Sequence, residues 1–262
     1  SSGLGLLKYS KENGLLKSFP STGDSLGPSH PYVYCLLRDS QNNFWLGTPT
    51  GGVNLFDEKT ESFLTLNGDH QDGLSGNTIL CFFEDSQNNL WIGTSTGLSK
   101  LSSPLEKDLV SKLSDSDLRL EFSHFGREVG FPNEVVYGIV EDDDGFLWLS
   151  TNEGLVKFDS KEEKVLKVYR RRDGCQTEEY NQNAFMKMEN DQIVFGGVSG
   201  FQMFYPDQLR SLSQTPRVEI TDLLINNKKV SSSTENLNLD YGQNDFTFEF
   251  AGLSFVNSDA NS

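Results

Sequence analysis

The apolar positions along the chain gather in short runs, and clusters of Asn, Asp, Ser and Gly separate one run from the next. Val, Ile, Phe, Tyr and Trp dominate these runs, which last about five to eight residues and show no helical periodicity. Branched and aromatic side chains of this kind favour the pleated surface of a β-sheet. The pattern therefore predicts an all-β protein whose strands are joined by tight turns.

The same pattern recurs four times. The stretch "DSQNNFWLGT" at residues 39–48 is nearly repeated by "DSQNNLWIGT" at 85–94, a third copy surrounds Trp148, and a fourth carries Val194 at the Trp position. From one copy to the next this position advances by 46, 57 and 46 residues. Each copy holds enough apolar runs for four antiparallel strands. Periods of this length are typical of β-propeller blades.

Polar residues and glycines mark the turns of each copy. The tetrads "SQNN", "SQNN" and "DDGF" stand where a hairpin must reverse, because Asn, Asp and Gly tolerate a left-handed backbone. A second turn is expected at the glycine that follows the Trp position, namely Gly51, Gly97, Gly154 and Gly200.

The longer spacing between the second and third copies indicates an insertion at residues 102–123. Its start, Ser103-Pro104 followed by "LEKDLVSKL", is typical of a helix N-cap, a proline at the first helical position and a short amphipathic helix. The interpretation that we favour is a solvated excursion between strands.

Two features suggest binding chemistry, and each also has a structural interpretation. The tryptophans could stack on sugars, but their recurrence at a fixed blade position favours packing between blades. The run from Asp142 to Gly145 suggests calcium, yet the sister copies carry Ser-Gln-Asn-Asn at this turn and no distant Glu completes a binding loop. We therefore expect core packing and turn formation, and no metal site or cofactor.

The reactive residue types form no catalytic constellation in the sequence. Cys35 and Cys81 occupy equivalent positions of the repeat, where the third copy has Gly138, so we expect small buried residues and not a reactive pair. The histidines have no partner at metal or catalytic-triad spacing; they are His30, His70 and His124. On these grounds the chain itself is not expected to be an enzyme.

Charge and hydropathy exclude further classes of function. The formal net charge is -16, from 22 Lys and Arg against 38 Asp and Glu, which disfavours binding to nucleic acid or to anionic membrane surfaces. Three cysteines are too few for a disulfide scaffold. No run approaches the roughly 18 apolar residues of a membrane-spanning helix, so we expect any membrane contact to come from a segment outside this sequence.

The repeat resembles the two-component regulator propeller family, through its Asp, turn, Leu-Trp-Ile-Gly-Thr, turn and Gly-Leu order, and through linkers such as "QDGLSGNTI" at 71–79. Residues 174–209, with the Phe-x-Pro-like closing motif Phe204-Tyr205-Pro206, resemble the last blade of that family. The stretches "TPRVEITDLLINNKKV" and "LNLDYGQNDFTFEFAGLSF" resemble the opening strands of the triple-tyrosine domain, an immunoglobulin-like β-sandwich that follows this propeller.

The resemblance implies two domains. Residues 1–212 are expected to form a β-propeller segment, and residues 216–262 the N-terminal part of an immunoglobulin-like domain. Within the propeller segment the expected divisions are a half blade at 1–24, entered near Gly3-Leu4, and blades at about 30–66, 77–125, 134–172 and 180–209. Because propellers remove exposed strand edges by closing into a ring, we expect these blades to form an arc of a larger ring.

The function that the resemblance implies is that of an input region. Such regions lie in the periplasm, as extracytoplasmic parts of bacterial inner-membrane receptors, and pass a signal to a cytoplasmic histidine kinase or diguanylate cyclase. The expected partners are a small-molecule ligand, with carbohydrate as one class, and a second receptor copy. Loops between blades are where propellers usually bind ligands, so Asp72 and Asn133 are candidate binding residues. A propeller enzyme that acts on polysaccharide and a protein-docking scaffold are the alternatives.

Overall fold

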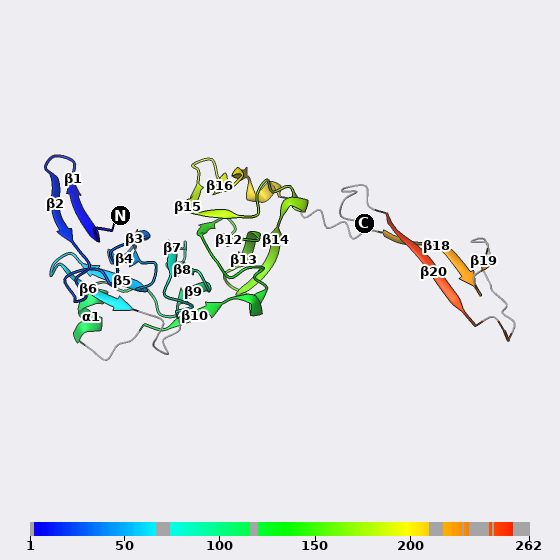
Figure 1. Cartoon of the computed structure of the whole chain (residues 1–262), viewed down its shortest axis with the longest axis horizontal. Coiled ribbons are helices and arrows are strands. Elements are labelled where there is room, and N and C mark those ends of the chain that lie inside the picture. Colours follow the sequence, from blue (N-terminus) through cyan, green and yellow to red (C-terminus); the bar gives the residue numbers. More distant parts are fainter. Residues whose placement is uncertain are drawn as a thin grey trace. The chain divides into compact units, whose positions relative to one another are not determined.

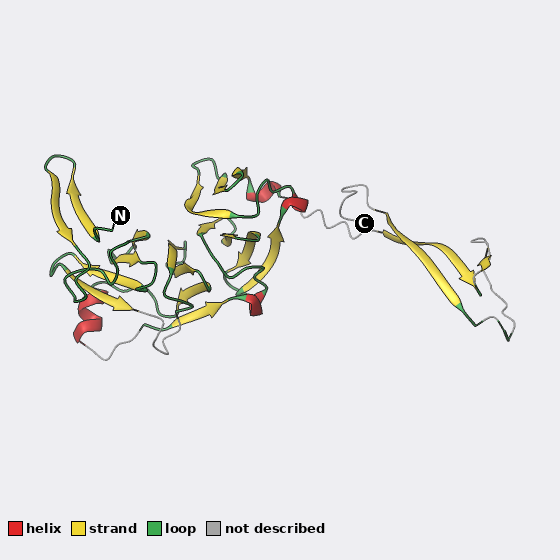
Figure 2. Cartoon of the chain, in the orientation of Figure 1, coloured by secondary structure: helices red, strands yellow, loops and turns green. Residues whose placement is uncertain are grey.

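The computed structural model describes residues 3–66, 74–115, 120–209, 217–226, 228–230, 241–242 and 244–253. The chain divides into two compact units, Ser1–Gln208 and Leu209–Ser262. Figures 1 and 2 show that strands dominate the described residues, which confirms the all-β class. No helix among the described residues is long and apolar enough to cross a membrane.

The described residues of the first unit form five antiparallel sheets, and each sheet uses consecutive strands. In order along the chain, the sheets are β1 (Leu6–Ser10) and β2 (Gly14–Phe19); β3 (Cys35–Arg38), β4 (Phe44–Gly47), β5 (Val53–Asp57) and β6 (Ser62–Leu66); β7 (Ile79–Glu84), β8 (Leu90–Thr94), β9 (Gly97–Leu101) and β10 (Phe122–Phe125); β11 (Gly138–Glu141), β12 (Phe146–Thr151), β13 (Gly154–Asp159) and β14 (Lys164–Tyr169); and β15 (Tyr180–Lys187), β16 (Ile193–Gly197) and β17 (Gly200–Phe204). Short 3-10 helices lie at Arg127–Val129, Arg171–Asp173 and Pro206–Gln208.

The first strands of the last four sheets line up beside one another. β3 contacts β7, β7 contacts β11, and β11 contacts β15. Figure 1 shows these sheets following one another as blades do. Adjacent sheets bury apolar clusters between them, and Trp45 and Trp91 each belong to one of these clusters. The three tryptophans have no exposed surface, which confirms their role in packing between blades.

A buried aspartate holds each tryptophan. The indole N–H of Trp45, Trp91 and Trp148 donates to Oδ2 of the aspartate six residues earlier, at 2.8 Å in each case. The other carboxylate oxygen accepts backbone N–H groups two and four residues after the aspartate. One carboxylate therefore closes the hairpin turn and fixes the ring that packs on the next blade. The left-handed residues of these turns are Asn42, Asn88 and Gly145, as the turn pattern predicts.

The position of two turn glycines differs from the prediction. In the first full copy the left-handed residue is Gly52 and not Gly51, because this loop is one residue longer and Val53 pairs with Gly47 as Leu98 pairs with Gly93. At the N-terminus Gly5, and not Gly3, corresponds to the blade glycine.

The evidence for Gly5 is its contacts. Gly5 and Gly154 both have positive φ, and a Cβ at either glycine would collide with a backbone carbonyl oxygen of the following strand. Those oxygens belong to Phe19 and Tyr169, which pair with equivalent residues of β1 and β13.

The insertion is not a solvated excursion, although it contains the predicted helix. Helix α1 spans Leu109–Asp115, so it begins after Ser103 and Pro104. Leu105 and Leu109 are buried in the cluster that holds Trp45. The backbone N–H of Leu109 also donates to Oδ1 of Asn43 at 3.2 Å. The insertion is therefore part of the core, because the neighbouring sheet covers its apolar face.

The second unit is described by itself. Strands β18 (Arg217–Ile225), β19 (Lys228–Val230) and β20 (Phe246–Leu253) form one antiparallel sheet in the order β19-β18-β20. Its immunoglobulin-like character stays a prediction.

Candidate functional site

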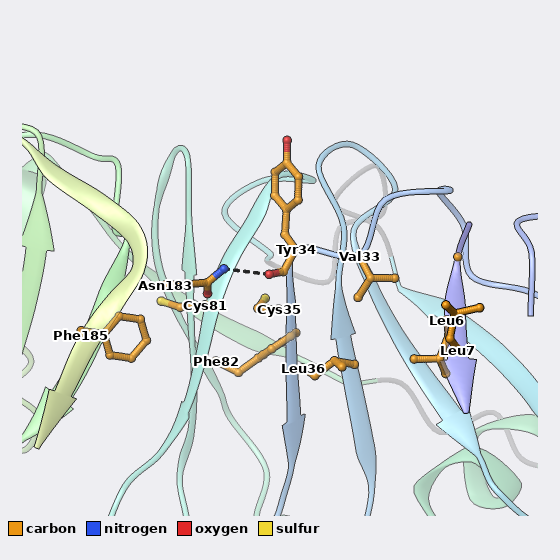
Figure 3. Close-up of a pocket in the computed structure, with 11 residues that line it drawn as sticks. Leu6, Leu7, Val33, Tyr34, Cys35, Leu36, Cys81, Phe82, Asn183 and Phe185 are labelled. Carbon is orange, nitrogen blue, oxygen red and sulfur yellow. Dashed lines mark hydrogen bonds between the residues drawn. The ribbon is translucent and has the colours of Figure 1, made fainter. Parts of the chain in front are cut away.

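One candidate site in the first unit is a pocket at the first strands of the blades. Its volume is about 500 Å³. Strands β1, β3, β7 and β15, with the residues just before β1 and β3, supply its walls; Figure 3 shows the lining residues, with the ring of Tyr34 pointing away from the others. The lining residues are Gly5, Leu6, Leu7, Val33, Tyr34, Cys35, Leu36, Cys81, Phe82, Asn183 and Phe185.

A bulge in β15 brings Asn183 to this pocket. The pairing of β15 with β16 shifts between Tyr180 and Phe185, and Asn183 has a left-handed φ of 57°. Its Nδ2 donates to the carbonyl oxygen of Tyr34 at 3.0 Å, as Figure 3 shows. The neighbouring Gln182 donates to the carbonyl oxygen of Leu80 at 3.2 Å. The first strand of the last blade is thereby tied to two earlier blades.

Sequence reasoning missed Asn183, although the sequence holds a signal. The run Asn181, Gln182 and Asn183 is polar where the other copies have apolar strand residues. A polar interruption of an inner strand is a place where side chains leave the regular ladder.

The two thiols of the pocket are protonated at neutral pH. Burial raises the pKa of the Cys81 thiol to about 12, and burial also raises the pKa of Cys35 well above its ordinary value. Because the thiolate is the nucleophile and the metal ligand, these thiols are poorly suited to either role. Cys81 is buried, as predicted, whereas Cys35 is half-buried.

Small residues face one another where the thiols lie. Cys35 pairs with Gly47, Cys81 with Gly93, and Gly138 with Ser150. In the first two full blades the larger residue of the pair lies on the first strand of the blade. In the third blade the larger residue, Ser150, lies on the second strand. In each of these three pairs, only one of the two facing residues has a side chain.

The chemistry of the lining is apolar and uncharged among the described residues. Its apolar side chains include Leu6, Leu7, Leu36, Phe82 and Phe185. Such a lining binds an apolar group and supplies no carboxylate pair or imidazole for acid–base catalysis.

Of the two predicted site residues, Asn133 does not line this pocket. Asp72 lies outside the described residues. Asn133 is half-buried in the loop before β11, where its Oδ1 accepts the backbone N–H of Val135 at 2.9 Å. That bond is typical of an Asx turn, so the acceptor atom of Asn133 is engaged within its own loop.

The acidic turn considered for calcium lies in a second hollow, of about 350 Å³, beside β15–β17. Asp142 binds the Trp148 indole and lies 3.4 Å from Lys157 Nζ. Asp143 pairs with Lys187 at 2.5 Å. Within the described part of the chain, no cluster of three or more His, Cys, Asp or Glu is arranged to hold a metal ion.

The repeat matches a known protein family, and the chain is similar in sequence to a known histidine kinase. The family described as "Two component regulator propeller" matches residues 27–50, 73–96 and 130–153. Histidine kinase P4 of Formosa agariphila is 32% identical over 155 residues, which are 55% of this chain and 11% of that protein.

One solved structure shares the fold of this chain. The extracellular domain of a protein assigned as a hybrid two-component system of B. thetaiotaomicron is 24% identical and aligns over 91% of this chain and 31% of its own, with a TM-score of 0.73. A second such domain from that organism is 18% identical over 95% of this chain and 39% of its own, with a TM-score of 0.43.

The chain thus spans about a tenth of the histidine kinase and about a third of the first solved domain. The matched residues cover the inner hairpins of three consecutive sheets, β3–β4, β7–β8 and β11–β12, together with the loops that lead into them. This chain therefore carries three repeats of the two-component regulator propeller family.

Proposed function

We propose that this chain is part of the extracytoplasmic, ligand-sensing input region of a bacterial hybrid two-component receptor. The observation that carries the proposal is the three propeller repeats in a chain that is 32% identical to a histidine kinase over 155 residues. The fold likeness to an extracellular domain supports it. The segment has a binding role, and the kinase or cyclase output belongs to other parts of the receptor.

The physical task of such a region is to favour one receptor arrangement over another. A ligand shifts an equilibrium only through its differential affinity for the two arrangements. Blades whose turns are locked by buried carboxylates act as rigid units, so a ligand between them changes the angle between blades and not their internal structure. The signal then passes to the membrane through the domain that follows and through a second receptor copy.

The ligand surface in this proposal is the set of loops that lead into the blades, which includes Asn133. The loop around Asn133 is held by an Asx turn, and Arg127 lies 4.0 Å from Glu134 within it. Polar groups on a loop held by a rigid sheet are suited to an uncharged polar ligand such as a carbohydrate.

A thermal-shift screen tests the proposal. The purified extracytoplasmic region is heated with oligosaccharides, amino acids and other metabolites, each over a range of concentrations. A concentration-dependent rise in Tm for one class identifies the input. Asn133→Ala should reduce that rise, whereas Asn190→Ala, on an exposed hairpin turn, should leave it unchanged. A ligand-independent capture of a protein partner, with no shift for any compound, would support a docking scaffold in place of a sensor.

A further inference from the structure

The last blade, β15–β17, lacks the buried carboxylate that locks the three preceding blades. Met188 stands at the position of the aspartate, and Val194 stands at the position of the tryptophan. The backbone of the turn is nevertheless the same: the N–H of Met188 donates to the carbonyl oxygen of Gln192 at 2.8 Å, as that of Asp142 does to Phe146 at 2.9 Å. A thioether is too weak an acceptor to replace the carboxylate. The turn of the last blade is therefore not tied to a core side chain.

The first strand of this blade is also loosely joined to its own sheet. β15 pairs with β16 at Tyr180 and again from Phe185 to Lys187, and residues 181–184 leave the ladder between these points. In the preceding blade, β11 pairs with β12 through four consecutive residues. Four of the eight residues of β15 thus have no partner in their own sheet. A segment with few backbone bonds of its own opens at the low end of the stability range.

Two amide side chains of this segment bind other blades instead. Nε2 of Gln182 donates to the carbonyl oxygen of Leu80 at 3.2 Å, and Nδ2 of Asn183 donates to that of Tyr34 at 3.0 Å, as Figure 3 shows for Tyr34. Leu80 and Tyr34 are equivalent, because each precedes the cysteine that faces a glycine of the second strand. Among the described strands, β3 and β7 are edge strands of their sheets. The two amides therefore take the place of ladder partners at that edge.

The contact of the last blade with its neighbour is of a different kind. The ring of Phe204 lies 4.8 Å from that of Trp148 between centroids, and both residues are buried. The ion pair between Lys187 and Asp143 lies at the surface. An apolar contact has no preferred direction, so it permits small shifts of the blade. The two amide bonds are directional, and they fix one position of the blade relative to the first two full blades.

We propose that the last blade is the moving element of this chain, and that Gln182 and Asn183 form a clasp that holds it in place. When the clasp opens, the blade parts from the first two full blades and its ladder loosens. The backbone runs from this blade directly into the second unit, which begins at Leu209. A role of this movement in signalling rests on the proposed sensor function, whereas the clasp itself does not.

Hydrogen exchange of the purified extracytoplasmic region tests the clasp without any ligand. The reporters are the amides of β16, compared with those of β8 and β12, the second strands of two preceding blades. Asn183→Gly keeps the left-handed φ of 57° and loses the amide, and Gln182→Met keeps the length of the side chain. The matched control is Asn190→Ala, which removes an amide bond to Gln192, of 2.9 Å, inside the same blade.

In the unchanged chain, the β16 amides should exchange faster than those of β8 and β12, after correction for intrinsic rates. The double variant Gln182→Met and Asn183→Gly should speed exchange of β16 by about 30-fold, which is about fivefold for each neutral hydrogen bond. Exchange of β8 and β12 should not change. Asn190→Ala should leave all three strands as they are.

Three results would overturn the proposal. One is equal protection of β16 and β12 in the unchanged chain. Another is an equal acceleration of all blades in the double variant, because the two bonds would then stabilise the whole chain and not one blade. The third is an effect of Asn190→Ala as large as that of the double variant.

The signalling role has a separate test. In the receptor that contains this chain, the double variant should change kinase output with no compound added. Unchanged output, together with faster exchange of β16, would show that the clasp exists but that the receptor does not respond to it. A receptor that responds to no compound in the thermal-shift screen would count against the sensor function and not against the clasp.

Discussion

Trp91 and Asp85 form one buried unit: the indole N–H donates to Oδ2 of the carboxylate at 2.8 Å, and Asp85 is only 5% exposed. Its Oδ1 accepts the backbone N–H groups of Gln87 and Asn89. A single side chain therefore accepts hydrogen bonds from the buried indole N–H and from two part-buried backbone N–H groups of the turn. The cost of removing it should exceed the value of one hydrogen bond.

Asp85→Ala should lower the free energy of unfolding by about 3 kcal/mol, since the buried indole N–H and two part-buried backbone N–H groups lose their acceptor. Urea denaturation measures this change. Asp57→Ala is the matched control, because Asp57 accepts similar turn bonds from Lys59 and Thr60 at an exposed turn and should cost less than about 1 kcal/mol. In a double-mutant cycle with Trp91→Phe, a coupling energy near zero would show that the indole bond contributes nothing.

Gly93→Ala should destabilise the chain by about 1–3 kcal/mol through overpacking. A Cβ at Gly93 would lie 2.5 Å from the Sγ of Cys81 and 2.6 Å from the carbonyl oxygen of Val136. Adding Cys81→Gly should recover part of the loss, since the pair Gly138–Ser150 has this arrangement. The recovery is partial because the Val136 carbonyl is backbone. Strictly additive losses in the two single variants and the double variant would refute this account.

Stability should fall above about pH 9 because of Cys81. Burial raises the pKa of this thiol to about 12 in the folded state, from an ordinary value of 9.0. Between these pH values the unfolded chain releases the proton and the folded chain keeps it, so the free energy of unfolding decreases as pH rises, by about 1.4 kcal/mol per pH unit. Chemical denaturation at pH 8, 9 and 10 should show a shallower decline for Cys81→Ala. Parallel declines in the two proteins would contradict the assignment.

The bond from Asn183 to Tyr34 should stabilise the association of the last blade with the first full blade. Asn183→Gly keeps the left-handed conformation and loses the amide, so we expect a loss of about 1 kcal/mol. Asn183→Ala also adds the strain of a left-handed alanine, for a total of about 2 kcal/mol. Urea denaturation of both variants tests this order. Met186→Ala, an exposed position on the same strand, is the control and should change stability little.

Local pattern was enough to predict the blades. Short apolar runs, turn residues with a left-handed preference and a tryptophan at a constant position each depend on neighbours within about ten residues, so they are readable from sequence. The burial of Trp45, Trp91 and Trp148 followed from the same regularity. The turn glycine of the first full copy was displaced to Gly52, because one added residue in a loop shifts the left-handed position without changing the pattern.

The sequence by itself determined the repeat, the strands and the turns, because these follow from local side-chain preferences. Only the tertiary structure decided which blades meet, and the relevant contacts join residues far apart in the chain. The bond between Asn183 and Tyr34 spans 149 residues, and the packing of Leu105 and Leu109 turns an apparent solvated insertion into core. Long-range contacts depend on how separate sheets stack, and local preferences carry no information about that stacking.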